Sequence, residues 1–131
     1  MKARNLGRLE LLAWINEVTE ADYPKVELCS DAIAFCQVLD AVHPVAGIQL
    51  HRLNFNAKNK DDFARNLKVL DDMLQKLKVN KRIQIEQMAN GKFQYNMEFL
   101  QWLFDYAHKI ASPTIMSTYN GYEKRLEAYK K

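Results

Sequence analysis

The chain has 131 residues, of which 48% are hydrophobic and 27% are charged, and its formal net charge is +3. This length suits one domain that can bury its own core without disulfides or metal. Four glycines and three prolines are few breakers, which favours long helices. The mild positive charge permits an acidic partner surface without choosing one. No run approaches the roughly 18 apolar residues that a membrane span requires.

The chain also lacks the residue patterns of metal and redox sites. Cys29 and Cys36 lie among apolar neighbours, no Cys-x-x-Cys is present, and the histidines are scattered (His43, His51, His108). We therefore expect two buried thiols, no zinc site and no cofactor. Residues 1–5 lead into an amphipathic segment without the apolar stretch of a secretory signal, so we expect a cytosolic, reducing compartment.

Apolar residues at helical spacing predict a first helix over residues 5–19, capped by Asn5. This helix should end near Thr19, because Tyr23 precedes Pro24 and the residue before a proline avoids helical dihedral angles.

A short helical turn over residues 24–28 is expected next. Ser30 is then predicted to cap a second helix, with Asp31 in its first turn. The apolar stripe of this helix comprises Ala32, Phe35, Cys36, Leu39 and Val42. Pro44 ends it.

Residues 50–58 predict a connection that is mostly loop, and a third helix is expected over residues 60–77. Asn59 can cap this helix. Its apolar residues repeat at helical spacing, at Phe63, Leu67, Leu70, Leu74 and Leu77. Asp71 and Asp72 point about 100° apart on a helix, so we interpret them as a solvated face instead of a catalytic pair.

The second half of the chain predicts a basic loop over residues 79–84 and a short helix over residues 85–90. Gly91 fits the left-handed position just beyond that helix. A long helix should then run from about residue 94 to residue 110. We interpret residues 111–131 as a linker or C-terminal extension that is helical at its end.

Residues 92–104 are unusually apolar, with eight apolar residues in thirteen positions: Phe93, Tyr95, Met97, Phe99, Leu100, Trp102, Leu103 and Phe104. A helix that is apolar nearly all round is typical of the middle of a small helical domain. Asn96 and Gln101 interrupt the run, and we expect them to form hydrogen bonds with neighbouring backbone.

Motifs of catalysis are missing from the sequence. It has no phosphate-binding glycine loop, no His-Glu-x-x-His and no Gly-x-Ser-x-Gly. No DNA-reading helix or aromatic-basic stacking motif is present either. We therefore expect neither an enzyme nor a nucleic-acid-binding protein.

The run Lys92-Phe93-Gln94-x-Asn96-x-Glu98-Phe99-x-Gln101-Trp102 closely resembles the K-F-Q-D-N-x-E-F-x-Q-W run of the end-binding (EB) family of microtubule plus-end tracking proteins. The run belongs to the N-terminal calponin-homology domain of that family. Three further stretches agree in order and spacing. They are residues 12–17, residues 36–40 followed by Pro44, and residues 54–58 together with residues 66–70. The resemblance covers residues 5–110.

This resemblance implies an all-α fold, a compact calponin-homology helical bundle over residues 5–110. It implies a non-catalytic module that docks between microtubule protofilaments, near the tubulin nucleotide site, and so favours growing plus ends. Because the outer surface of tubulin is acidic, basic side chains would steer and orient binding. The positions that match the binding face of the family are Arg8, Arg52, Lys58, Asn66, Lys68, Lys81, Lys92 and Gln94.

The sequence departs from the family pattern at Tyr95, where aspartate is usual, and at His51, where lysine is common. The family's C-terminal coiled coil is absent from this sequence. We therefore expect this fragment to be monomeric and a full-length protein to be dimeric. The resemblance implies a location in the cytoplasm, on microtubules and their plus ends, with spindle or flagellar basal structures as further sites. The alternative is a calponin-homology module for another partner, such as actin or an adaptor complex. No membrane partner is expected.

Overall fold

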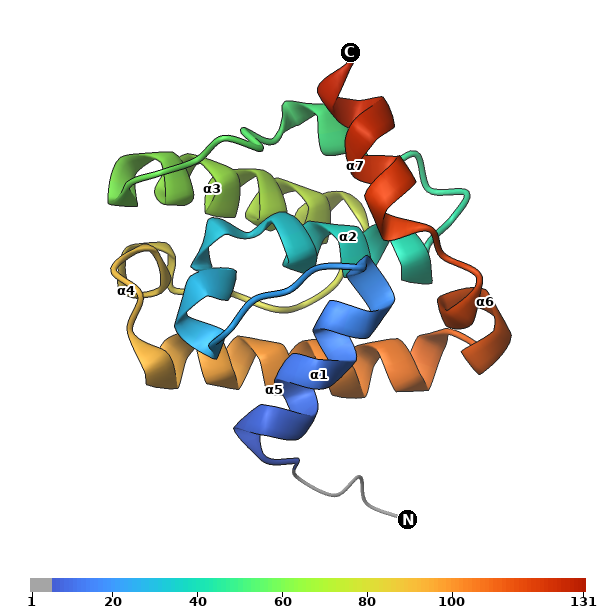
Figure 1. Ribbon diagram of the computed structural model, residues 1–131, viewed down its shortest axis with the longest axis horizontal. Helices are drawn as coiled ribbons and strands as arrows, with labels where there is room; N and C mark the ends of the chain where they lie inside the picture. The colour runs from blue at the N-terminus through green and yellow to red at the C-terminus, as the bar shows by residue number, and fades with distance from the viewer. Residues whose placement is uncertain (1–5) are drawn as a thin grey trace.

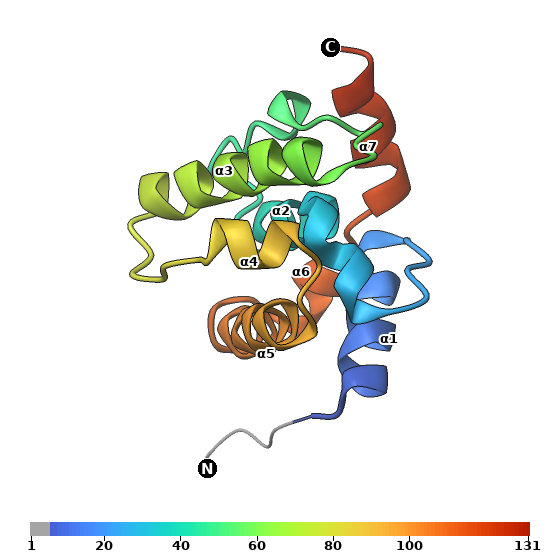
Figure 2. The same cartoon turned by 90° about the vertical axis from the view of Figure 1, so that its left-hand side faces the viewer.

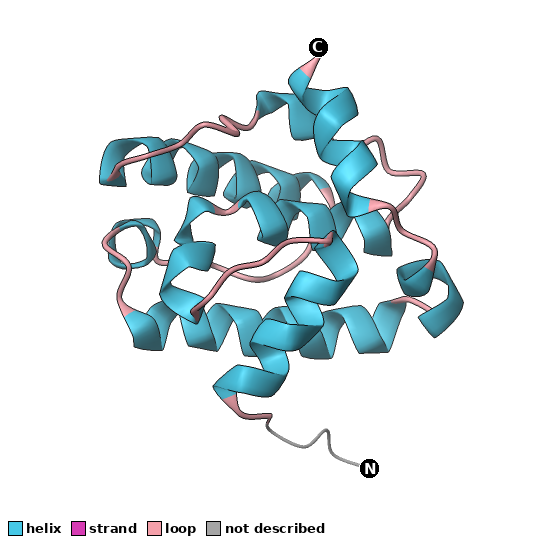
Figure 3. Ribbon diagram, in the orientation of Figure 1, coloured by secondary structure: helices cyan, strands magenta, loops and turns pink. Residues whose placement is uncertain are grey.

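The computed structural model describes residues 6–131, which fold into helices joined by loops (Figure 1). No strand occurs in this range (Figure 3), and none of its helices is long and apolar enough to cross a membrane. The expected all-α class is confirmed. The helices are α1 (Arg8–Thr19), α2 (Ile33–Val42), α3 (Lys60–Lys76), α4 (Ile85–Ala89), α5 (Phe93–Ile110), α6 (Pro113–Ser117) and α7 (Gly121–Tyr129), with 3₁₀ turns η1 (Val26–Asp31) and η2 (Leu50–Arg52).

Helix α2 is the centre of the bundle. It lies between α3 and α5 (Figure 1), and of its ten residues only Asp40 is not buried. Phe35 on α2 meets Phe99 on α5 edge to face, with ring centroids 4.9 Å apart. The predicted apolar stripe of α2 is therefore confirmed as core.

The prediction that residues 92–104 form the central helix is wrong. Helix α5 runs along the outside of the bundle (Figure 1) and buries one face, composed of Asn96, Phe99, Leu100, Leu103 and Ala107. Its remaining aromatic side chains pack against one another near the surface. Trp102 stacks on Tyr106 at 5.0 Å, and Phe104 meets Trp14 edge to face at 5.1 Å. The excess of apolar residues is thus explained by aromatic clusters and not by central burial.

The first two long helices begin differently from the sequence predictions. Ser30 does not cap α2, because Ser30 and Asp31 belong to η1 and Ala32 precedes the helix with a positive φ of 65°. The capping bond comes from Asp31, whose Oδ1 accepts a hydrogen bond from the backbone N–H of Ile33 at 2.9 Å. At α1, Asn5 lies outside the described residues and the structure has Gly7 at the N-cap.

Other local predictions are confirmed. Asn59 caps α3, since its side-chain oxygen accepts from the backbone N–H of Asp62 at 2.9 Å. Gly91 adopts φ +73° beyond α4, a left-handed conformation that glycine favours. The side chain of Asn96 donates to the backbone carbonyls of Met88 and Lys92 at 3.3 and 3.1 Å.

The C-terminal residues pack onto the bundle. Helix α6 contacts α2, and α7 contacts α1 and η2. Asn120 caps α7 by accepting from the backbone N–H of Glu123 at 3.2 Å. The helical end of the chain fits the sequence pattern, whereas α6 was not expected because Pro113 was interpreted only as the end of the preceding helix.

Candidate functional site

The helices α3 and α5 begin at the same end of the molecule, with α4 between them (Figures 1 and 2). Helix α4 contacts both neighbours. Three of the predicted binding residues belong to this end: Lys58 precedes α3, Lys92 is the N-cap of α5, and Gln94 lies in the first turn of α5. All three side chains are exposed. We call this surface the helix-start face.

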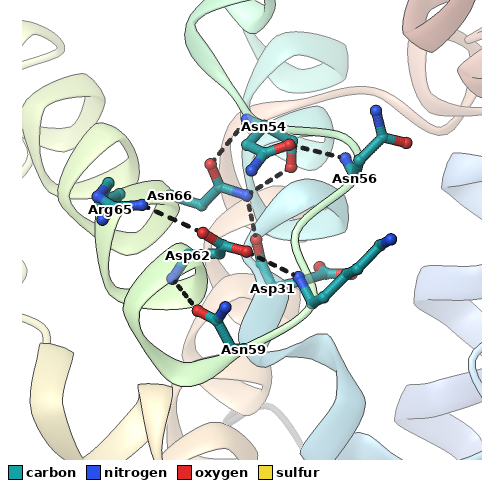
Figure 4. A network of polar contacts seen from close by, with 8 residues as sticks. Asp31, Asn54, Asn56, Asn59, Asp62, Arg65 and Asn66 are labelled. Atoms are coloured by element: carbon teal, nitrogen blue, oxygen red, sulfur yellow. Dashed lines mark hydrogen bonds and ion pairs between the residues drawn. The ribbon is translucent and has the colours of Figure 1, made fainter.

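A network of side-chain amides fixes the loop that carries Lys58 (Figure 4). The Asn66 side chain accepts from the backbone N–H of Asn54 at 2.9 Å and donates to the carbonyls of Asn54 and Asp31, each at 3.0 Å. The backbone N–H of Lys58 donates to Asp62 at 3.0 Å. The loop is thereby tied to both η1 and α3, which holds Lys58 at a defined place.

Asn66 therefore differs from the other predicted binding residues. It is 1% exposed and its amide is fully engaged, so its side chain is not presented to a partner. Its contacts make it a positioning residue for the loop of residues 54–58.

Lys81, in the loop between α3 and α4, is already paired within the molecule. Its Nζ donates to Glu98 at 2.7 Å and lies 5.7 Å from the centroid of the Trp102 ring. The Lys81 side chain is 18% exposed, whereas that of Glu98 is 63% exposed. The charge of Lys81 is therefore balanced by a carboxylate that itself faces solvent.

The remaining predicted cations come from other parts of the fold. Arg52 lies in η2 and pairs with Asp72 of α3 at 2.9 Å. Arg8 opens α1, and η2 and the first turn of α1 lie at opposite extremes of the view in Figure 1. Lys68 is exposed on α3. Within residues 6–131, the cations that make no ion pair among the predicted set are Arg8, Lys58, Lys68 and Lys92.

Sequence reasoning missed the acidic partners of this surface. Asp72 was interpreted as part of a solvated face, yet it pairs with a residue 20 positions away, and Glu98 pairs with one 17 positions away. Pairs at such separations leave no periodic signal in a sequence, because they depend on how helices are packed. Glu98 could have been suspected only as the acidic member of the motif that begins at Lys92.

A buried carboxyl group lies behind the loop. The hydroxyl of Tyr23 donates to both carboxylate oxygens of Asp31, at 2.8 and 3.0 Å. Burial raises the pKa of Asp31 to about 6, although its hydrogen bonds with Ile33 and Tyr23 oppose the rise. Because the carbonyl of Asp31 also accepts from Asn66, this group links the start of α2 to the loop of residues 54–58.

The described residues offer no evident reactive centre. Cys29 and Cys36 are free and buried, and burial raises the pKa of each thiol. No group of three histidine, cysteine, aspartate or glutamate side chains in the part of the chain that the structure describes could hold a metal ion. What the surface does offer is exposed positive charge held by a rigid helical frame.

This bundle and its surface define a known class of domain. The chain belongs to the calponin homology (CH) domain family, whose profile matches residues 7–109.

The relatives are proteins of the RP/EB type, which confirms the resemblance seen in the sequence. Microtubule-associated protein RP/EB family member 1C of Arabidopsis thaliana is 37% identical over 105 residues, covering 80% of this chain and 32% of the relative. Member 1A of the same plant is 37% identical over 120 residues, covering 92% and 43%. Protein BIM1 of Saccharomyces cerevisiae is 34% identical over 97 residues, covering 74% and 28%. The chain thus spans less than half the length of these relatives.

A solved structure supports the same assignment. It comes from work on the "Structural Basis of Microtubule Plus End Tracking by XMAP215, CLIP-170 and EB1", and it superposes with a TM-score of 0.79 at 30% identity. The superposition covers 92% of this chain and 98% of the other. Because this share exceeds that of residues 7–109, the likeness includes residues outside the family profile.

Proposed function

We propose that this chain is a non-catalytic module that binds the microtubule lattice near growing plus ends through its basic surface. The observation that carries the proposal is the 37% identity with two microtubule-associated RP/EB proteins. The superposition with a structure from a study of plus-end tracking adds to it. Because the relatives are longer than this chain, the proposal concerns the domain.

The physical basis is the set of exposed cations without a carboxylate partner. Lys58 and Lys92 lie on the helix-start face, with Gln94 beside Lys92, and we propose that this face meets tubulin first. Arg8 and Lys68 extend the positive surface, and Asn66 shapes the loop that bears Lys58. Attraction between such a surface and an acidic polymer speeds and orients association, and salt screens it. Binding should therefore weaken as salt is raised.

Co-sedimentation with stabilised microtubules tests this proposal. The double variant Lys58→Glu with Lys92→Glu should weaken pelleting by at least roughly tenfold, since like charges placed across an interface cost several kcal/mol. The matched control is Lys109→Glu with Lys130→Glu, which makes the same change in net charge at two exposed positions away from the helix-start face.

Three outcomes are distinct. Loss of binding in the first variant alone supports both the function and the face. Equal loss in both variants shows that net charge matters and contradicts the face. Failure of the unmodified chain to pellet contradicts microtubule binding itself, and the same assay with filamentous actin then tests the alternative partner, which no contact in the structure favours.

We also propose that the longer protein acts on the cytoskeleton as a dimer formed by a C-terminal coiled coil. Microtubules, their plus ends and spindle or flagellar basal structures are its proposed locations. Sedimentation equilibrium should give a monomer for residues 1–131 and a dimer for the longer protein. A dimer of the short chain would contradict this arrangement.

A further inference from the structure

Helix α7 is fastened to the bundle through Arg125. Its guanidinium group donates to the carbonyl of Thr19, to that of Glu20 at 2.9 Å and to the side-chain oxygen of Gln37 at 2.9 Å. Thr19 and Glu20 end α1, where carbonyl groups lack partners within the helix. Arg125 thus caps α1 from a position more than a hundred residues further along the chain.

The entrance of α7 is fixed as well. Gln37 is fully buried and donates to the carbonyl of Gly121 at 2.8 Å. The hydroxyl of Tyr119 donates to Asp40 at 2.9 Å. A Cβ atom at position 121 would overlap the carbonyl of Thr19, so only glycine allows this close approach. Both polar residues of the 36–40 motif therefore serve to hold the C-terminal segment.

The second half of α7 supports η2. The two elements are in contact, and Ala128 of α7 and Leu50 of η2 both belong to the buried core. The hollow between them is lined by Lys124, Glu127 and Lys131 from α7 and by Ile48 and His51 from the other side.

Arg52 depends on this support. It is the last residue of η2, and its guanidinium group donates to Asp72, in an ion pair whose members are each about a third or more exposed. Exposed pairs contribute little to holding a position. The backbone of η2, braced by α7, is therefore the main determinant of where Arg52 lies.

We infer that α7 is a positioning element of the binding surface, in which Arg125 fixes the helix and the helix holds η2 so that Arg52 can meet tubulin. The inference rests on the proposed function for its consequence and on the contacts above for its structural part. It assigns a role in binding to residues 119–128, beyond the end of the family match at residue 109.

The structural part is tested by hydrogen exchange on residues 1–131, without microtubules. Arg125→Gln and Lys130→Gln remove the same charge from the C-terminal segment, but Lys130 is exposed. Arg125→Gln should accelerate exchange at the amides of Arg52 and Leu53, which bond to Gln49 and Leu50, and leave the core of α3 protected. Gly121→Ala should do the same by displacing the start of α7. Unchanged exchange at Arg52 and Leu53 in both variants would overturn the inference.

The functional part is tested by a double-mutant cycle with Arg52→Gln. Arg125→Gln should weaken microtubule binding roughly three- to tenfold in the original chain and have little effect when Arg52 is already Gln. With Lys92→Gln in place of Arg52→Gln, the two effects should be additive. Additivity in both cycles would overturn the positioning role, because it would mean that Arg125 acts only through general stability.

The two proposals fail separately. If the unmodified chain does not bind microtubules, the proposed function is wrong while the exchange data still decide whether α7 holds η2. If binding is intact and both cycles are additive, the function stands and the role of α7 falls.

Discussion

Lys81 and Glu98 form an ion pair of 2.7 Å between the loop before α4 and the exposed side of α5, and the same Lys81 nitrogen lies over the Trp102 ring. The family resemblance assigns Lys81 to the binding face. The structure adds that an internal carboxylate already occupies it, so an acidic partner must compete with Glu98 for this cation.

Removing that competitor should strengthen binding. Glu98→Gln leaves Lys81 in place and frees its charge, so microtubule affinity should rise about two- to fivefold, the range set by the strength of exposed ion pairs. The gain should shrink at high salt. Co-sedimentation over a range of salt concentrations measures both effects.

Glu86→Gln is the matched control for Glu98→Gln. Glu86 is an exposed residue of α4 that makes no ion pair within the described residues. If both variants gained the same affinity, the effect would come from net charge, and release of Lys81 would be refuted.

The contact between Phe99 and Phe35 should dominate the stability of the bundle. Phe99 is 1% exposed, so Phe99→Ala should lower the free energy of unfolding by about 3–5 kcal/mol. Leu9→Ala, at a side chain that is 75% exposed, should change it by less than about 0.5 kcal/mol. Urea unfolding followed by circular dichroism gives both values, and a small effect at Phe99 would contradict the assignment of α2 and α5 as core partners.

The sequence was sufficient for the helices but not for their ranks in the bundle. Periodicity and caps located α3 closely, because Asn59 and the stripe from Phe63 are local signals. The same reasoning placed α5 at the centre, because counting apolar residues cannot distinguish burial from aromatic packing at the surface. The central position of α2 depends on its short apolar side chains being covered from both sides, which is a property of the assembled fold.

The site shows the same division. Exposed cations such as Lys58 and Lys92 could be selected from the motif, but the burial of Asn66 and the pairing of Lys81 depend on residues brought together by folding. Arg125 had no signal beyond the amphipathic spacing of its helix, since its partners Thr19 and Gln37 lie far away in the sequence.

Asp31 should make stability depend on pH. Its folded pKa of about 6 lies above the ordinary value of 3.8 because of burial, so the folded chain holds the proton more tightly than the unfolded chain does. The stabilisation is present in full below pH 3.8 and is lost as pH rises through about 6.

Asp31→Asn isolates this effect, because asparagine does not titrate and its side-chain oxygen can still accept from Ile33 and Tyr23. The unfolding free energy of the original chain minus that of the variant should fall between about pH 4 and pH 7 and be flat above. Urea unfolding at several pH values measures the difference. A difference that stays constant over this window would show that Asp31 ionises normally.

The two thiols should be inert in the native state. Burial raises the pKa of Cys29 to about 12 and that of Cys36 further, and the thiolate is the reactive form. A chromogenic disulfide reagent should therefore react slowly with the folded chain at neutral pH and rapidly with two thiols in denaturant. Fast reaction without denaturant would contradict the burial of both side chains.

The most direct test of the central claim is to image a fluorescent, artificially dimerised version of residues 1–131 on growing microtubules. The proposed function predicts comets at growing ends that fade when growth stops, and loss of those comets in the Lys58→Glu, Lys92→Glu variant. Uniform coating of the lattice would contradict end recognition, and absence from microtubules at low salt would contradict the proposed function as a whole.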